Sequence, residues 1–150
     1  MGFLDSMDIS ASGLTAQRLR MDTISSNLAN AESTRVADGQ GPYRRQVVVF
    51  EAKSPRRSSF SRILGQQMQA PYSGVRVKEI RQVGDNEEPF RRVYEPGHPD
   101  ADENGYVTYP NINVVSEMTD LISATRAYQA NAQVIDGIKS MALRALELGK

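Results

Sequence analysis

The sequence predicts an α+β fold in which long N- and C-terminal helices pack as a coiled-coil-like pair, with a small β-rich insert between them. Three observations support this prediction. Apolar residues recur every seven positions near both ends of the chain, which is the spacing of a helix seam. Apolar and polar residues alternate in parts of the middle, as they do in strands. Glycine, proline and asparagine separate these middle segments, as they do in turns.

The first helix is predicted over residues 3–31. Its seam has the narrow form of a coiled coil rather than the broad stripe of a helix in a globular core. The expected seam residues are Met7, Leu14, Met21, Ile24 and Leu28. The helix is expected to end in "SSNLANAESTR", residues 25–35, where Asn27 and Asn30 lie on one face. These side chains can bond to turn backbone or to a neighbouring helix.

The second helix is predicted over residues 113–148, with Asn113 as its N-terminal cap. The main seven-residue row is Val114, Leu121, Tyr128, Ile135 and Ala142. The accompanying row is Met118, Thr125, Ala132 and Leu146. Val115, Ile122 and Ile138 widen the apolar stripe into a second face. This second face indicates that the helix needs more partners than the first helix alone.

The middle of the chain, residues 36–110, is predicted to hold short strands. Their expected positions are residues 44–53, 74–83, 90–96 and 105–110. Residues 54–73 show little periodicity and are predicted to be a flexible loop. The expected organisation is therefore a helical assembly domain from residues 1–35 and 111–150, interrupted by the β-rich insert.

The two helices are predicted to pair antiparallel, because their seams share one period and lie far apart in the chain. Two narrow seams bury little apolar surface, and helices depend on tertiary packing for stability. The pattern therefore favours a subunit that is completed by its neighbours. The alternative is an intramolecular bundle docked on the sheet.

Composition excludes several functional classes. Lys and Arg together number 18, as do Asp and Glu, so the net charge of zero argues against a nucleic-acid binder. The absence of cysteine excludes disulfides and a cysteine nucleophile. No apolar run is long enough to span a membrane, and the N-terminus lacks the pattern of a secretory signal. No nucleophile-elbow or phosphate-loop pattern occurs, so we expect neither an enzyme nor a cofactor.

The segment "DADENG" supports one alternative function. Asp100, Asp102 and Asn104, with Gly105 in sixth place, match the first half of a calcium-binding EF-hand loop. The twelfth position holds Asn111 rather than glutamate, and no helix leads into the loop. A polar turn before a strand explains the segment as well. The alternative hypothesis is therefore a calcium-regulated binding module that uses residues 100–111.

Two long motifs resemble one known family. The segment "LTAQRLRMDTISSNLANAESTR" is similar to the N-terminal signature of the flagellar rod and hook axial proteins, whose Asn-x-Ala-Asn core is here Asn27 to Asn30. Ser33 stands where the family usually has threonine, and Thr34 follows. The blocks "YEPGHPDA", "PNINVVSEM" and "SATRAYQAN" are similar to C-terminal segments of rod members. The resemblance covers roughly residues 1–50 and 91–150.

This resemblance implies a structural subunit of the bacterial flagellar proximal rod, which crosses the periplasm and transmits torque. The implied partners are copies of the chain, other rod proteins, the basal-body adaptor, the surrounding ring proteins and the flagellar type III export apparatus, without a cleaved signal peptide, nucleic acid or membrane insertion. The expected assembly residues are the seam residues of the first helix, Asn27, Asn30, Val114, Met118, Leu121, Tyr128, Asn131 and Ile135.

Overall fold

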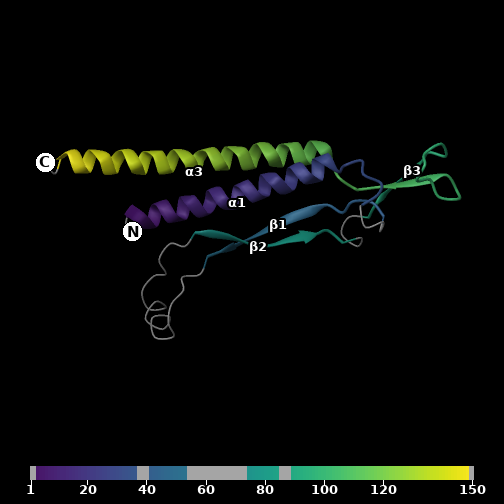
Figure 1. Ribbon diagram of the computed structural model, residues 1–150, viewed down its shortest axis with the longest axis horizontal. Coiled ribbons are helices and arrows are strands. Elements are labelled where there is room, and N and C mark those ends of the chain that lie inside the picture. Colours follow the sequence, from purple (N-terminus) through teal and green to yellow (C-terminus); the bar gives the residue numbers. More distant parts are fainter. Residues whose placement is uncertain (1–2, 37–40, 54–73, 85–88, 149–150) are drawn as a thin grey trace, which may run out of the picture.

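The computed structural model describes residues 3–36, 41–53, 74–84 and 89–148, and it has helices at both ends and strands between them (Figure 1). The elements are α1 (Phe3–Ala29), β1 (Gln46–Ala52), β2 (Val75–Gln82), β3 (Arg91–Tyr94), β4 (Tyr106–Tyr109) and α3 (Val114–Leu148). The predicted α+β fold is confirmed. The predicted flexible loop, residues 54–73, lies outside the described residues.

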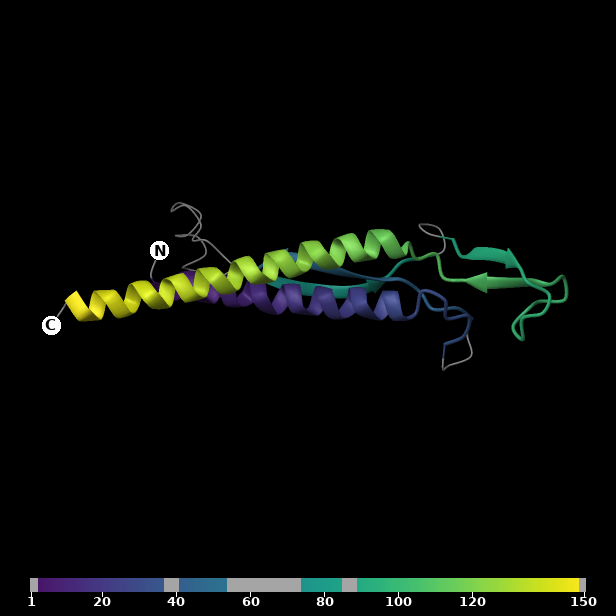
Figure 2. The ribbon, with the colours of Figure 1, turned by 90° about the horizontal axis from the view of Figure 1, so that it is seen from above.

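The two helices pack side by side in opposite directions (Figure 2). At 1.5 Å per residue, α1 is about 40 Å long and α3 about 52 Å. Asn113 caps α3, because its Oδ1 accepts hydrogen bonds from the backbone N–H groups of Val115 and Ser116. The C-terminal part of α3 extends beyond the N-terminus of α1 (Figures 1 and 2). We call this unpaired part, residues 142–148, the overhang.

The buried row of α3 differs by one position from the expected accompanying row. Its buried residues are Glu117, Ala124 and Ile138, which are seven or fourteen positions apart. Met118, which was expected in the seam, is 51% exposed. Within the accompanying row, Thr125 and Ala132 are half-buried, but Met118 and Leu146 are exposed. The more deeply buried row holds a small and a charged residue, which allow the helices to approach closely. Ile138 was assigned to a second face and instead lies inside the helix pair.

The strands form two separate hairpins rather than one sheet. β1 pairs antiparallel with β2, with a register shift between Val49 and Phe50, and this hairpin contacts α1. β3 pairs antiparallel with β4 beyond the ends of the helices (Figure 1). The molecule therefore has three layers where the β1–β2 hairpin runs beside α1, which lies between α3 and this hairpin (Figure 1).

Ser12 connects α1 to the start of β2. Its hydroxyl donates to the Ile9 carbonyl oxygen at 2.6 Å and accepts the Val75 backbone N–H at 3.0 Å. A Cβ added to Gly74 would collide with this hydroxyl. The hairpin can therefore reach α1 only where residue 74 lacks a side chain.

We expect Gly74→Ala to destabilise the chain by about 1–2 kcal/mol, because it displaces Ser12 and leaves the Val75 N–H without its acceptor. Urea denaturation measures the change. Gly84→Ala is the matched control, since no atom lies within 4 Å of an added Cβ there. The control should be neutral or slightly stabilising. Equal effects of the two substitutions would contradict this role for Ser12.

Candidate functional site

A buried polar network joins the end of α1 to β1 and to the start of α3. Its centre is Asn27, which is 1% exposed. The Asn27 Oδ1 accepts the Gln46 backbone N–H at 2.9 Å, and its Nδ2 donates to the Gln46 carbonyl oxygen at 2.8 Å. A carboxamide supplies both an acceptor and a donor, so it satisfies both backbone groups of one strand residue. The sequence predicted that Asn27 bonds to turn backbone or to another helix; the backbone partner is a strand residue.

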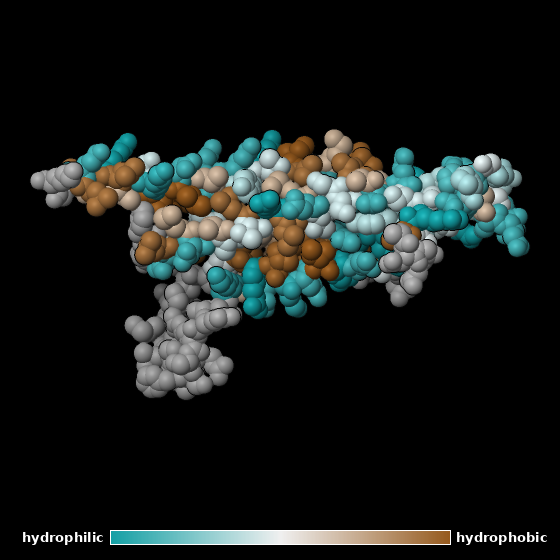
Figure 3. Space-filling model, in the orientation of Figure 1, coloured by the Kyte–Doolittle hydropathy of each residue, from teal (hydrophilic) through white to brown (hydrophobic). Residues whose placement is uncertain are grey.

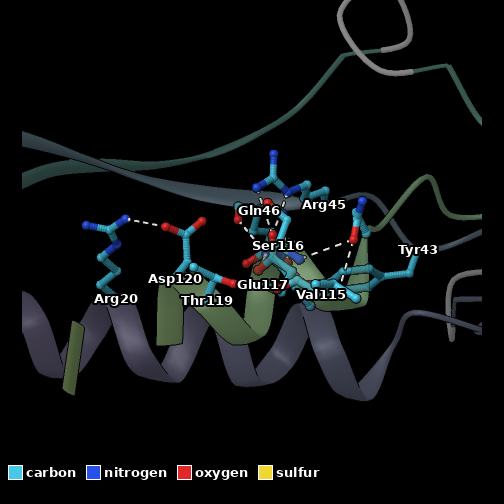
Figure 4. A network of polar contacts seen from close by, with 11 residues as sticks. Arg20, Tyr43, Arg45, Gln46, Val115, Ser116, Glu117, Thr119 and Asp120 are labelled. Carbon is cyan, nitrogen blue, oxygen red and sulfur yellow. Dashed lines mark hydrogen bonds and ion pairs between the residues drawn. The ribbon is translucent and has the colours of Figure 1, made fainter. Parts of the chain in front are cut away.

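Glu117 brings α3 into the same network (Figure 4). The Arg45 Nε and Nη2 donate to the Glu117 Oε1 at 2.8 and 2.7 Å. The Asn27 Nδ2 donates to the Glu117 Oε2 at 3.1 Å. Glu117 is 1% exposed, so its charge is compensated by these donors rather than by water. Its place in the first turn of α3 also suits the helix dipole.

The network continues into the chain that follows α1. The Tyr43 hydroxyl donates to the Asn27 Oδ1 at 3.1 Å and lies 3.2 Å from the Ser26 Oγ. Asn30 has a more local role. Its Nδ2 donates to the Ser26 carbonyl oxygen at 2.9 Å, and its Oδ1 accepts the Ser33 hydroxyl at 3.1 Å. Asn30 therefore completes the end of its own helix.

Sequence reasoning missed Tyr43, Arg45 and Glu117 as members of this site. None of the three belongs to an apolar row that the sequence predicts. A signal was present, since Glu117 lies seven positions before Ala124 in a row that α3 buries. An acidic residue in a seam position indicates a buried partner of opposite charge.

The expected assembly residues fall into two groups. Those on α1 are half-buried, except Ile24 and Asn27, which are buried, and Leu121, Tyr128, Asn131 and Ile135 on α3 are half-buried. Contacts within the chain account for much of this burial; for example, the Thr125 hydroxyl lies 3.4 Å from the Met21 sulfur. Val114 and Met118 are exposed and have no such cover. The buried and half-buried residues therefore pack within the helix pair of the chain itself.

Apolar side chains remain uncovered on two parts of α3 (Figure 3). Val115, Met118 and Ile122 are 73%, 51% and 54% exposed near its start, and we call these three residues the outer face. In the overhang, Leu143, Leu146 and Leu148 are 54%, 70% and 89% exposed. Clustered apolar surface of this kind marks interaction sites in soluble proteins.

The "DADENG" carboxylates are engaged by groups of the protein. The Asp102 Oδ1 accepts the backbone N–H groups of Tyr106 and Asn104, each at 2.9 Å. The Tyr106 hydrogen bond is the main reason that the pKa of Asp102 lies below its usual value, and Arg92 acts in the same direction. Gly105 has a φ of +77°, as the turn requires.

Asp100 instead ties this loop to the chain after α1. It accepts the Thr34 hydroxyl and an Arg35 Nη2, each at 2.7 Å. Within the described residues, no group of three or more His, Cys, Asp or Glu side chains could hold a metal ion. The structure therefore offers the calcium hypothesis no support.

Known proteins resemble the chain at both ends and over its whole length. Residues 7–35 match the family model described as flagella basal body rod protein. Residues 103–148 match the model described as flagellar basal body rod FlgEFG protein C-terminal. The flagellar basal-body rod protein FlgC of Bacillus subtilis is 43% identical, over 97% of each chain. The chain belongs to the FlgC family of flagellar basal-body rod proteins.

Other FlgC proteins show the same full-length similarity. The FlgC of Borreliella burgdorferi is 41% identical over 99% of this chain and 98% of its own. The FlgC of Aquifex aeolicus is 42% identical over 100% of this chain and 99% of its own. Both helices and the Asn27 site lie within the aligned length. This FlgC-family chain is a structural subunit of the flagellar basal-body rod, and it is not an enzyme.

In the part of the chain that the structure describes, neither helix has the length and apolar content needed to cross a membrane.

Proposed function

We propose that the chain polymerises through its terminal helices with copies of itself and with other rod proteins in the proximal rod, and that this polymer transmits torque across the periplasm. The observation that carries the proposal is the uncovered apolar surface of α3. The outer face and the overhang together expose six large apolar side chains, Val115, Met118, Ile122, Leu143, Leu146 and Leu148. Apolar area that stays in contact with water in the monomer is a source of free energy for association.

The layer arrangement directs this association to α3 more than to α1. Helix α1 lies between α3 and the β1–β2 hairpin, so much of its surface is already covered. The outer face of α3 has no described layer over it (Figures 1 and 3). Within the proposed assembly domain of residues 1–35 and 111–150, α1 then supports α3, and α3 meets the neighbours.

The resemblance to axial proteins supports a more specific set of partners. We extend the proposal to export through the flagellar type III apparatus without a cleaved signal peptide, and to contacts with the basal-body adaptor and the surrounding ring. Of the expected assembly residues, Val114 and Met118 are free to meet such partners, because they are 43% and 51% exposed.

The test replaces two apolar side chains of the outer face. We expect Val115→Ser with Ile122→Ser to abolish swimming in a strain that depends on this protein, because it removes apolar contact area between subunits. Folding should change little, since both side chains are more than half exposed. Motility in soft agar and the recovery of intact rods by electron microscopy are the measurements.

The matched control is Arg126→Ser with Gln129→Ser, which changes two exposed polar residues on the next turns of α3. The control strain should swim. If the two variants swim equally well, or if the Val115/Ile122 variant is impaired only because it is unfolded by circular dichroism, the outer face is not an assembly surface.

A further inference from the structure

The apolar seam between α1 and α3 does not by itself define how the helices align. Seam residues on α3 repeat every seven positions, so a shift of seven residues again places a seam position against α1. Four contacts define the observed alignment: Asn27 with Glu117, Arg20 with Asp120, Met21 with Thr125, and Gly13 with Asn131. With this spacing, the start of α1 lies opposite about residue 141, and the overhang begins there.

The buried row of α3 does not by itself favour the observed alignment over one shifted by seven residues toward the C-terminus of α3. The shifted alignment would keep Ala124 and Ile138 in the buried row and would exchange the charged Glu117 for Ala145. Leu121, which is half-buried in the second turn of α3, would lose its cover. Apolar burial in the buried row therefore does not account for the observed alignment.

The polar network distinguishes the two alignments. In the shifted one, Asn27 would face Ala124 in place of Glu117, and Arg45 would lose both of its bonds to the carboxylate. Fixing the register of a helix pair is the best-attested role of buried polar groups. We propose that Asn27, Arg45 and Glu117 specify the register of α1 against α3 and thereby keep the overhang uncovered. This inference concerns the single chain and does not depend on the proposed assembly.

Two disulfide reporters measure the register, because the natural chain contains no cysteine. Met21→Cys with Thr125→Cys reports the observed register, since these side chains touch at 3.4 Å. Met21→Cys with Ala132→Cys reports the shifted register. Residue 132 lies about 10 Å further along α3, beyond the reach of a disulfide in the observed register. The measured quantity is the ratio of the two cross-linking yields under a mild oxidant.

The main variant is Arg45→Met with Glu117→Met, which removes the charges and keeps similar side-chain length. We expect the ratio of observed to shifted cross-link to fall at least about tenfold. Arg20→Met with Asp120→Met is the matched control, since it removes a half-exposed ion pair between the same two helices, one helical turn away. The control should change the ratio by less than about threefold, because an exposed ion pair contributes little. An unchanged ratio in the main variant would overturn the proposal and assign the register to the β3–β4 connection and the Thr34–Asp100 contact.

Moving the carboxylate along α3 gives an independent test of the register, because it predicts the gain of a cross-link rather than the loss of one. Glu117→Ala with Ala124→Glu moves the acidic residue by seven positions along the same row. We expect this variant to form the shifted cross-link in preference to the observed one, because only the shifted register brings residue 124 to Asn27 and Arg45. A transplanted variant that keeps the observed cross-link, or that is unfolded by circular dichroism, would overturn the proposal. Glu117→Gln keeps an Oε1 acceptor for Arg45 but replaces the Oε2 that accepts from Asn27 with an amide nitrogen, so we expect its cross-link ratio to lie between those of the natural side chain and the Arg45→Met/Glu117→Met variant.

Discussion

Glu117→Ala is expected to cost about 3–5 kcal/mol of unfolding free energy, because it leaves Arg45 without its buried partner. The Glu117 side chain is only 2% exposed and that of Arg45 25%, so water replaces little of the lost interaction. The Asn27 Nδ2 also loses one of its two acceptors. The measurement is urea denaturation followed by circular dichroism at 222 nm, the standard helix signal.

Asp120→Ala is the control for this prediction, because Asp120 pairs with Arg20 one helical turn further along α3. The two side chains of that pair are 40% and 35% exposed, and the ion pair spans 3.1 Å. Exposed pairs of this kind contribute about 0–1 kcal/mol. Losses of equal size at the two positions would show that Glu117 contributes no more than a surface charge.

Ile138→Ala is expected to cost about 2–4 kcal/mol, through lost transfer free energy and the cavity left between the helices. Ile138 is 5% exposed in the buried row of α3. Ile122→Ala removes the same atoms from the same helix at a position that is 54% exposed. We expect this control to cost about 1 kcal/mol or less. The free energy of unfolding of the two variants, measured in parallel, is the test.

The pair of isoleucines also separates folding from assembly. Ile138→Ala should lower motility only as far as it lowers the amount of folded chain. Ile122→Ala should lower motility while the chain stays folded, if the outer face is an assembly surface. Similar stability losses at both positions would mean that the buried row of α3 is not the one described.

Much of the fold follows from local patterns. The seven-residue rows predicted both helices, and the Gly- and Pro-rich connections separated four strands that the structure confirms within a few residues. Side-chain spacing and turn residues act over a few positions, so one sequence contains that information. Met118 was expected in the seam of α3 in place of Glu117, because the two residues are neighbours and only the path of α1 decides which is covered.

In the candidate site too, the sequence predicted one feature and the tertiary structure decided the rest. The sequence identified Asn27 as a residue that needs hydrogen-bond partners after the end of a helix. The partners themselves, Gln46 and Glu117, are 19 and 90 positions away along the chain, and no local pattern connects them.

The sequence by itself determined the helices at both ends, the short strands between them, the importance of Asn27 and the resemblance to rod proteins. Tertiary structure alone decided that the described strands form two hairpins, that α1 lies between α3 and one of them, and which face of α3 remains uncovered. The physical reason is that burial and charge pairing depend on which distant segments meet. Glu117 shows this most directly, since it is an ordinary helix-start residue until α1 and β1 enclose it.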